Sequence, residues 1–257
     1  MRWDERQVAM LREMGVRLWA PPVDDEAVAV EERPIEPAPV AAPVIARSPA
    51  AAPLEQRVAL PTAVATLDWP ALRATVAACT ACKLCEGRRQ TVFGVGNEHA
   101  HWMIVGEAPG EQEDRQGEPF VGKSGQLLDN MLRAVHLTRG EAEPARQVYI
   151  ANTIKCRPPG NRNPEPEELA KCEPFLIRQL QLVQPKIIVA MGRFAVHSLL
   201  RSAEPIGRLR GRVHAYHGVP LIVTYHPAYL LRNPEDKAKA WDDLCLAAET
   251  AANAAAA

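Results

Sequence analysis

The feature that most constrains this chain is a short apolar run that ends abruptly in a loop containing glycine and proline. The run is residues 103–105, with sequence MIV, and Gly106, Pro109 and Gly110 interrupt it. Uniformly apolar runs of this length are typical of central strands in parallel sheets, which are covered on both faces. Apolar residues at helical spacing follow over residues 127–135. The stretch therefore predicts a strand, a loop and a helix.

Three further apolar runs have the same character. They cover residues 148–154, 186–189 and 221–225, and helical patterns at 165–183 and 193–200 lie between them. Strands that alternate with helices form βαβ units, in which the strands are parallel. We therefore expect an α/β fold, a three-layer α/β/α sandwich around a four-stranded, mainly parallel central sheet.

The compact domain is predicted to cover residues 67–250. A hairpin partner of the last strand is expected at residues 213–217, with the turn at Gly218. A closing helix is expected at residues 236–250, followed by a frayed tail of sequence AANAAAA. The sequence contains no internal repeat, so a repeat architecture is not expected.

Two N-terminal segments precede this domain. Residues 1–20 are predicted to contain a short amphipathic helix with an apolar face from Val8 to Leu18. Residues 21–66 are rich in alanine and proline and lack a usable period, which is typical of an extended, disordered linker. The helix has two interpretations that the sequence leaves open. It docks on its own domain, or it binds a partner protein as a tethered peptide.

The composition supports a folded core and does not by itself indicate a polyanionic partner. Hydrophobic residues make up 47% of the chain, and the formal net charge is −1. A charge of this size gives no bulk attraction to nucleic acid. No apolar run reaches the membrane-spanning length of about 18 residues, and the N-terminus, MRWDERQVAM, lacks the apolar core of a secretory signal. We expect a cytoplasmic protein with no membrane partner.

Six cysteines stand at positions 79, 82, 85, 156, 172 and 245. In a reducing compartment, such a pattern indicates metal or redox chemistry rather than disulfides. The first two form a C-x2-C pair, and Cys156 and Cys172 lie far from it. This spacing favours a four-iron four-sulfur cluster over a zinc site, whose ligands usually form two close pairs. Buried apolar cysteines are the remaining alternative. Cys85 competes for a place in the cluster, and Cys245 is expected in the core.

The loops at the predicted strand ends contain long runs of polar and aromatic residues. These are GEAPGEQED and GEPFVGKSGQLLD after the first strand, NTIKCRPPGNRNP after the second and HPAYLLRNP after the fourth. In this order and with the cysteines, they resemble the uracil-DNA glycosylase superfamily, and closely its iron–sulfur-containing type 4 branch. The resemblance covers residues 79–241. It implies a DNA repair enzyme that hydrolyses the N-glycosidic bond of uracil in single- or double-stranded DNA and leaves an abasic site.

The resemblance also implies a cofactor. This is one structural four-iron four-sulfur cluster held by Cys79, Cys82, Cys156 and Cys172, with Cys85 outside the set. We expect the cluster to hold a basic loop in place rather than to act as a redox centre. The protein is expected to act as a monomer on uracil-containing DNA.

Three side chains match the family's pocket for a nucleotide extruded from the duplex. Phe120 matches the residue that stacks on uracil, and Asn152 matches the one that reads the base with the donor and acceptor of its amide. His226 matches the histidine that donates to the charge developing on the leaving base, which a neutral imidazole is able to do. Without the resemblance, Phe120 would be assigned to the core, Asn152 to a strand-end turn and His226 to a loop.

The group that handles the attacking water is less clearly indicated. Gly106, Glu107 and Ala108 directly follow the first strand and are expected to line the pocket. Other branches of the superfamily have an acid where this chain has Ala108, so a base at that position is excluded. Glu113 is expected to orient the water or the cationic sugar, and Glu107 to shape the pocket near the uracil. The alternative is a solvated acidic loop.

Five residues are expected to contact DNA. The resemblance assigns Leu230 as an apolar wedge that holds the gap left by the extruded base. Arg232 is expected to bind a phosphate. Lys155, Arg157 and Arg162 surround Cys156 in the sequence, so the cysteine loop is predicted to contact the DNA backbone as well.

Two other functions are compatible with these motifs. One is a catalytically weak DNA-binding or polymerase-associated module on the same fold, against which the intact set of Phe120, Asn152 and His226 argues. The other is a variant that traps the sugar covalently, as a related branch with an arginine- and histidine-rich insertion does. The corresponding segment here, NTIKCRPPGNRNPEPEE, contains no histidine, which argues against that variant.

Overall fold

The computed structural model describes residue 10, residue 13 and residues 62–256. Residues 21–61 of the predicted linker at 21–66 and most of the predicted helix at 1–20 therefore lie outside the described residues. Met10 and Glu13 are both helical, and Met10 packs against a hydrophobic cluster of the compact domain. That contact favours the interpretation in which the N-terminal helix docks on its own domain. A protein partner for this helix stays a prediction.

The centre of the molecule is a six-stranded sheet with the order β1-β3-β2-β4-β6-β5. The four inner strands are parallel to one another, as the four apolar runs predict. They are β2 (Trp102–Gly106), β3 (Val148–Asn152), β4 (Ile187–Met191) and β6 (Val219–Thr224). The α/β fold class is confirmed.

The predicted number of four strands is wrong, because an antiparallel strand extends the sheet at each edge. At one edge β5 (Val213–Tyr216) forms a hairpin with β6, as expected from the sequence. At the other edge β1 (Val95–Gly96) pairs with β3. A two-residue strand has no alternation to detect. Its glycine has a φ of 116°, and a β-carbon there would lie 2.0 Å from the carbonyl oxygen of Val148.

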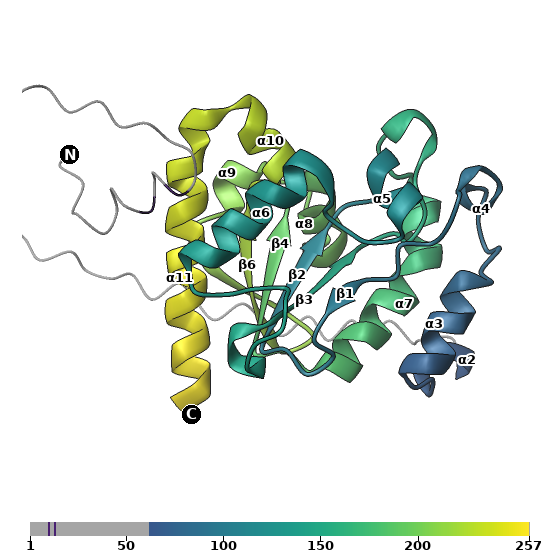
Figure 1. Ribbon diagram of the computed structural model, residues 1–257, viewed down its shortest axis with the longest axis horizontal. Helices are drawn as coiled ribbons and strands as arrows, with labels where there is room; N and C mark the ends of the chain where they lie inside the picture. Colours follow the sequence, from purple (N-terminus) through teal and green to yellow (C-terminus); the bar gives the residue numbers. More distant parts are fainter. Residues whose placement is uncertain (1–9, 11–12, 14–61, 257) are drawn as a thin grey trace, which may run out of the picture. The chain divides into compact units, whose positions relative to one another are not determined.

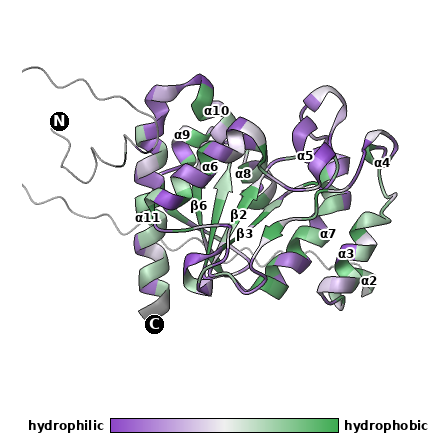
Figure 2. Ribbon diagram, viewed as in Figure 1, coloured by the Kyte–Doolittle hydropathy of each residue, from purple (hydrophilic) through white to green (hydrophobic). Residues whose placement is uncertain are grey.

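Helices cover both faces of the sheet, because alternate residues of each inner strand point to opposite faces. In β2, Ile104 belongs to one hydrophobic cluster, and Met103 and Val105 belong to the other. The first cluster includes residues of α6 (Gly122–Ala134), α10 (Pro227–Arg232) and α11 (Lys237–Ala256). The second includes residues of α7 (Pro166–Val183), α8 (Arg193–Leu200) and α9 (Ile206–Leu209). Figures 1 and 2 show these layers around the apolar strands.

A third hydrophobic cluster joins the N-terminal helices to α7. These helices are α2 (Thr62–Ala65), α3 (Trp69–Ala77) and α4 (Leu84–Gly87), and Figure 1 places them beside α7, away from α11. Helix α2 begins before residue 67, so ordered structure starts inside the segment predicted as linker. Asp68 caps α3 by accepting a hydrogen bond from the backbone N–H of Ala71 at 3.0 Å.

Several short elements lie in segments that the sequence suggested were loops. They are α5 (Glu111–Gln116) and the 3-10 turns η1 (Pro144–Arg146), η2 (Pro159–Asn161) and η3 (Pro234–Asp236). The closing helix α11 continues through the alanine tail to Ala256 instead of fraying after residue 250.

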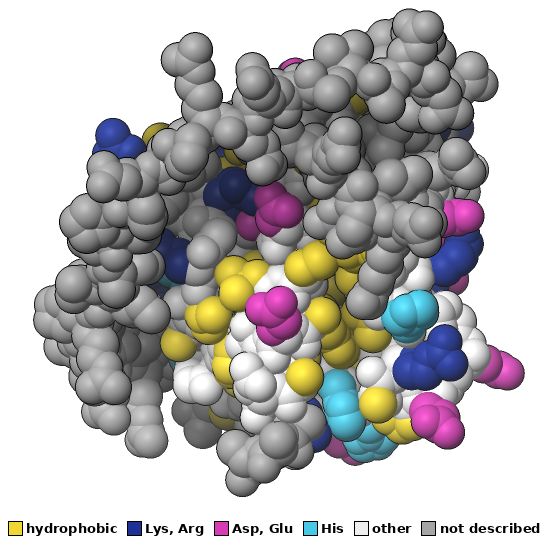
Figure 3. Space-filling view, turned by 90° about the vertical axis from the view of Figure 1, so that its left-hand side faces the viewer, with side chains coloured by type: hydrophobic (Ala, Val, Ile, Leu, Met, Phe, Trp, Pro, Cys, Tyr) yellow, Lys and Arg dark blue, Asp and Glu magenta, His cyan; other side chains and the backbone are white. Residues whose placement is uncertain are grey.

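The side of the molecule where α11 lies is turned to the viewer in Figure 3, where hydrophobic side chains gather on the described surface beside histidines. A pocket of about 300 Å³ lies near the amino ends of the inner strands and is lined by His101, Trp102, His136, Arg146 and Lys186 together with alanines of α11. Among the described residues, no helix combines the length and the apolar character needed to cross a membrane.

Candidate active site and cysteine pocket

The carboxyl ends of β2 and β3 lie side by side. Gly106, the last residue of β2, is paired in register with Asn152, the last residue of β3. Backbone hydrogen bonds continue past the strands, from Thr153 N–H to the Gly106 oxygen at 3.0 Å and from Ile154 N–H to the Glu107 oxygen at 3.3 Å. The hydroxyl of Thr153 also donates to the Glu107 carbonyl at 2.6 Å. The two loops that were predicted to form the site are therefore joined at their bases.

Gly106 leaves room for two predicted site residues. A β-carbon at this position would lie 2.5 Å from Oδ1 of Asn152 and 2.5 Å from Cζ of Phe120. Both distances are far below van der Waals contact, so the residue between the Asn152 amide and the Phe120 ring has to be glycine. Asn152 is 3% exposed and Phe120 is 5% exposed. The structure therefore brings the predicted stacking ring and the predicted reading amide to one place.

Phe120 is held in a conformation that phenylalanine rarely adopts. Its φ is 52°, in the left-handed region. Helix α6 fixes the residue from the other side, because a β-carbon on Gly125 would lie only 1.8 Å from the Phe120 carbonyl oxygen. Backbone strain of this kind persists where the surroundings determine it and occurs frequently at functional sites.

His226 completes the group. It is the N-cap of α10, and its ring is stacked on Phe120 with ring centroids 5.2 Å apart and an interplanar angle of 24°. Its Nδ1 accepts a hydrogen bond from the backbone N–H of Ala228 at 3.1 Å. This contact assigns the proton of the neutral ring to Nε2, which leaves Nε2–H as a donor. Burial, together with the nearby positive charge of Arg232, lowers the pKa of His226 to about 4, so the imidazole is neutral at pH 7.

The pKa of Glu107 is raised to about 7 by burial, and the positive charge of Arg193 opposes this shift in part. A carboxyl group that titrates near neutral pH beside a strand-end site is a candidate for acid–base chemistry. The neighbouring Ala108 is half-buried and packs against the third hydrophobic cluster.

Glu113 has a structural contact that the sequence did not indicate. One of its carboxylate oxygens accepts from the backbone N–H of Gly110 at 3.0 Å, and the other accepts from the backbone N–H of Val121 at 2.9 Å. Because Val121 follows Phe120, this carboxylate ties the start of α5 to the residue next to the stacking ring. The expectation that Glu113 orients water therefore has a competing account, in which it shapes the loop.

Asp114 is the residue of this loop whose role sequence reasoning missed. It is 2% exposed, and its two oxygens accept from the backbone N–H of Arg89 at 3.0 and 3.2 Å. Arg89 follows α4, which contains Cys85. Asp114 thus anchors the cysteine-bearing segment to the acidic helix α5. The sequence carried no signal for this role, because the burial of Asp114 is visible only in the structure.

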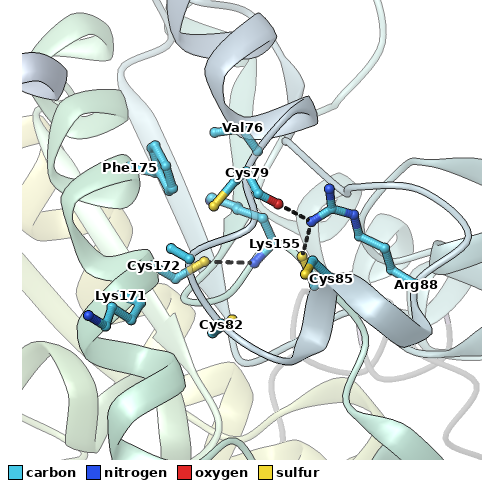
Figure 4. Close-up of a pocket in the computed structure, with 11 residues that line it drawn as sticks. Val76, Cys79, Cys82, Cys85, Arg88, Lys155, Lys171, Cys172 and Phe175 are labelled. Atoms are coloured by element: carbon cyan, nitrogen blue, oxygen red, sulfur yellow. Dashed lines mark hydrogen bonds between the residues drawn. The ribbon is translucent and has the colours of Figure 1, made fainter.

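Five of the six cysteines line a single pocket, shown in Figure 4. They are Cys79, Cys82, Cys85, Cys156 and Cys172. Val76 and Phe175 supply apolar walls, and the side chains of Arg88, Lys155 and Lys171 also line it. The four cysteines predicted as ligands therefore do converge, although they come from three separate parts of the sequence. Cys245 lies elsewhere and packs against the cluster that includes α11.

Positively charged and backbone donors face the sulfur atoms. Arg88 donates from Nη1 to the Cys79 carbonyl at 2.8 Å and to Sγ of Cys156 at 3.2 Å. The backbone N–H of Lys155 donates to Sγ of Cys172 at 3.4 Å. Donors of this kind stabilise sulfur that carries negative charge.

Burial alone would keep these thiols protonated. It raises the pKa of Cys82 and Cys156, and it raises that of Cys172 to about 12. Thiolates in such a pocket therefore require a bound metal to stabilise them. An all-sulfur donor set suits iron–sulfur clusters and zinc. Within residues 62–256, no three Cys, His, Asp or Glu side chains are arranged to hold one metal ion.

Two of the predicted DNA contacts, Leu230 and Lys155, are buried in this structure. Leu230 is fully buried in the core against α6 and α11, whereas its neighbour Leu231 is 43% exposed. Helical geometry turns consecutive residues of α10 in different directions. Lys155 is 1% exposed, and its ammonium donates to the Asn152 carbonyl and to Oε1 of Gln179 at 2.8 and 2.7 Å. Burial lowers the pKa of Lys155 to about 8.

The three predicted arginine contacts have different surroundings. Arg232 is exposed on α10. Arg157 donates to Oδ1 of Asn161 at 2.7 Å and lies 3.7 Å from a carboxylate oxygen of Glu111. Arg162 forms an ion pair with Glu168 at 2.6 Å, at the start of α7. Arg157 and Arg162 therefore hold the loop around Cys156 and expose only part of their side chains.

Comparisons with known proteins agree with this geometry. The family described as the uracil DNA glycosylase superfamily matches residues 93–245. A type-4 uracil-DNA glycosylase of Archaeoglobus fulgidus is 42% identical over 168 residues, which cover 62% of this chain and 81% of that protein. A type-4 uracil-DNA glycosylase of Thermotoga maritima is 43% identical over 157 residues, which cover 60% of this chain and 79% of that protein.

A third relative covers more of both chains. It is a type-4 uracil-DNA glycosylase of Pyrobaculum aerophilum, 38% identical over 190 residues, which cover 70% of this chain and 93% of that protein. The residues matched by the family model include the strand-end loops described above, together with Cys156 and Cys172 of the cysteine pocket. The chain belongs to the uracil DNA glycosylase superfamily and, within it, to the type 4 branch.

Proposed function

We propose that this protein removes uracil from DNA by hydrolysing the N-glycosidic bond, which leaves an abasic site. The observation that supports this most directly is the convergence of Phe120, Asn152 and His226 at the carboxyl ends of adjacent parallel strands. Ligands of open α/β sheets bind at this edge. A stacking ring, a reading amide and a neutral imidazole donor are the groups that excision of a flipped pyrimidine needs.

Each of these groups has a distinct task in the proposed reaction. The uracil ring stacks on Phe120 after the nucleotide leaves the duplex. The Asn152 amide pairs with the base edge, where uracil and cytosine present opposite donor and acceptor patterns. As the bond to the sugar breaks, negative charge grows on the base, and the Nε2–H of His226 donates to it in a site from which water is largely excluded.

Glu107 is the carboxylate that we assign to the attacking water and the cationic sugar. Of the buried and half-buried acids described between Glu107 and Asp114, the other two, Glu113 and Asp114, have their oxygens hydrogen-bonded to backbone groups. The side-chain carboxylate of Glu107 has no hydrogen bond to another described residue, and its pKa of about 7 leaves both protonation states accessible. Glu113 then acts by holding the loop that presents Phe120.

Cys79, Cys82, Cys156 and Cys172 are proposed to hold one structural four-iron four-sulfur cluster. Such a cluster is several ångströms across, so its sulfur ligands stand farther apart than the ligands of one zinc ion. A wider spacing of this kind agrees with the observation that, among the described residues, no three Cys, His, Asp or Glu side chains are arranged to hold one metal ion. When bound, the cluster supplies a rigid crosslink between the N-terminal helices, the loop after β3 and α7.

We propose that DNA lies along α10 and the neighbouring loops. Leu231, which is the exposed leucine of the pair, is the side chain available to fill the gap in the duplex. The exposed Arg232 is positioned beside it for a phosphate contact. DNA binding as a monomer is part of the same proposal.

A direct assay tests the function. The protein is incubated with single- and double-stranded oligonucleotides that contain one uracil, and alkali then cleaves any abasic site. We expect strand cleavage at the uracil position only, and none with matched thymine oligonucleotides. A protein that binds both oligonucleotides without producing alkali-labile sites would be a DNA-binding module instead. A protein–DNA product that survives denaturant would indicate a covalent trap.

A further inference from the structure

Lys155 is a buried cation for which the reaction described above has no use. Its side chain is among the largest in the described chain to be fully buried. An ammonium group is costly to remove from water unless polar partners surround it. None of the ion pairs among the described residues includes Lys155. Its position therefore has to be explained by neutral acceptors and by the sulfur atoms nearby.

One acceptor of Lys155 is the backbone of the base-reading residue. The ammonium donates to the Asn152 carbonyl at 2.8 Å. Asn152 is the last residue of β3 and is paired with Gly106, the last residue of β2. Its carbonyl therefore lies at the end of the strand ladder. The contact closes a turn from residue 152 to residue 155, which fixes the backbone from which the Asn152 amide projects.

The second acceptor belongs to the helix that also carries a cysteine of the pocket. The ammonium donates to Oε1 of Gln179 at 2.7 Å. Gln179 is fully buried in α7, two helical turns after Cys172. Its amide nitrogen donates to the Phe93 carbonyl at 2.9 Å and to the Tyr149 hydroxyl at 3.0 Å. All the hydrogen-bonding groups of this amide are therefore oriented, and Tyr149 belongs to β3 itself.

The backbone of Lys155 faces the sulfur atoms directly. Its N–H donates to Sγ of Cys172, and Cys156 is the next residue. Figure 4 shows this contact as a dashed line between Lys155 and Cys172. A thiolate set around a metal would be anionic, and the lysine ammonium is a buried positive charge that interacts with Cys172 and Cys156.

We propose that Lys155 is a positioning residue that couples the cysteine pocket to base recognition, by holding the strand end that presents Asn152 against α7. This inference rests on the proposed function, because it takes Asn152 as the residue that reads the base. It predicts that loss of the ammonium disturbs the Asn152 turn without removing any group that touches the substrate.

A matched pair of variants tests the structural half of the proposal. Lys155→Met removes the ammonium and keeps the side-chain volume, and Lys171→Met makes the same change at an exposed lysine that lines the same pocket. Hydrogen exchange of the Thr153 and Ile154 amides is compared in full-length samples with equal iron content. We expect exchange to rise on the order of tenfold in Lys155→Met and to stay unchanged in Lys171→Met. Equal exchange in both variants and wild type would overturn the coupling.

A double-mutant cycle tests the functional half. Asn152→Ala, Lys155→Met and the double variant are assayed for excision, and Lys155→Met is also combined with His226→Ala. We expect a loss on the order of tenfold in Lys155→Met that disappears in the Asn152→Ala background and persists in the His226→Ala background. The same loss in both backgrounds would reduce Lys155 to general stability and overturn the proposal.

The hydrogen-exchange comparison and the excision assays together distinguish failure of this proposal from failure of the proposed function. If wild type fails to excise uracil, the function is wrong, and the exchange measurement alone decides whether Lys155 positions the Asn152 turn. Should Lys155→Met not accumulate as folded protein, Gln179→Leu takes its place, because it removes one of the two acceptors and leaves the lysine. The same two outcomes then support or overturn the proposal.

Discussion

The ring of His226 is stacked on that of Phe120 with centroids 5.2 Å apart, and Phe120 in turn lies against the strand-end glycine of β2. A histidine in this position is neutral and is fixed in one tautomer by the Ala228 N–H. It is therefore prepared to donate to a base that becomes negative, without having to lose a proton first.

Replacement of His226 by Ala tests this donor. We expect the excision rate to fall by about 10²–10³-fold, the usual result when one preorganised donor to a developing anion is lost. DNA affinity should remain within about twofold, since the phosphate contacts are elsewhere. Single-turnover kinetics and a gel shift with the same oligonucleotide measure the two quantities. A variant with the wild-type rate would remove His226 from the mechanism.

The lowered pKa of His226 predicts a pH dependence of stability. The folded-state pKa is about 4, below the ordinary value of 6.5, so between these values the unfolded chain binds more protons than the folded one. The contribution of His226 to stability is complete above pH 6.5 and is lost as the pH falls toward 4. Urea unfolding at pH 7 and pH 5 should show a smaller difference in His226→Gln than in wild type.

Nuclear magnetic resonance gives a second reading of the same group. With histidine labelling, the ring signals of His226 should not shift between pH 5.5 and pH 8. His226 signals that move with a midpoint near the ordinary pKa would contradict the buried, neutral imidazole.

Gly106→Ala is expected to lower both the stability of the fold and the rate of excision, and the two effects are measured separately. The added carbon meets Phe120 and Asn152 at 2.5 Å, so both must move, at a cost of about 1–3 kcal/mol in the free energy of unfolding. Excision should fall by at least about tenfold, because reactive geometry tolerates little displacement. Gly207→Ala is the matched control, since a β-carbon there has nothing within 4 Å. Thermal unfolding and the oligonucleotide assay distinguish the two variants.

The two leucines of α10 should behave differently. Leu230→Ala opens a cavity in the core and is expected to lower the free energy of unfolding by about 2–5 kcal/mol. Leu231→Ala removes an exposed side chain and should leave stability unchanged. If Leu231 fills the gap in the duplex, its loss slows excision from double-stranded DNA more than from single-stranded DNA. Equal effects on both substrates would exclude the wedge.

Cysteine variants test the cluster independently of activity. Cys156→Ala should lose the brown colour and most of the iron and should unfold at a lower temperature, because three separate segments lose their crosslink. Cys245 lies outside the pocket, so Cys245→Ala should keep the iron content of wild type. Cys85→Ala should keep it as well. Iron content equal to wild type in Cys156→Ala would refute its role as a ligand, and loss of iron in Cys85→Ala would reassign the set.

The sequence predicted most of the sheet because its inner strands are buried on both faces. Residues 103–105 and 187–189 contain only apolar residues, and burial on two faces produces such runs. The two-residue edge strand β1 has no such apolar run and was missed. The other edge strand, β5, was predicted from its hairpin turn instead. Helix α5 was missed for a related reason, since its sequence EQEDRQ has no apolar face and is stabilised by its capping contacts.

The site was predicted unevenly, and the difference follows from what each side chain contacts. Phe120, Asn152 and His226 were placed by motif, and the structure brings them together: Phe120 lies against the strand-end Gly106 beside Asn152, and its ring is stacked on His226. The motif did not show that Glu113 bonds two backbone N–H groups or that Lys155 is buried. The first depends on how the loop folds back at Val121, and the second depends on Gln179 in α7. The sequence alone does not distinguish a charged residue that faces solvent from one that faces the core.

Gly125 constrains the stacking residue although it lies further along the chain, in α6. Because a β-carbon at residue 125 would lie 1.8 Å from the Phe120 carbonyl oxygen, a larger residue fits there only if the backbone that carries the ring is displaced. A substitution in α6 would therefore alter the proposed base pocket through the main chain, without any change in the side chains of the pocket itself.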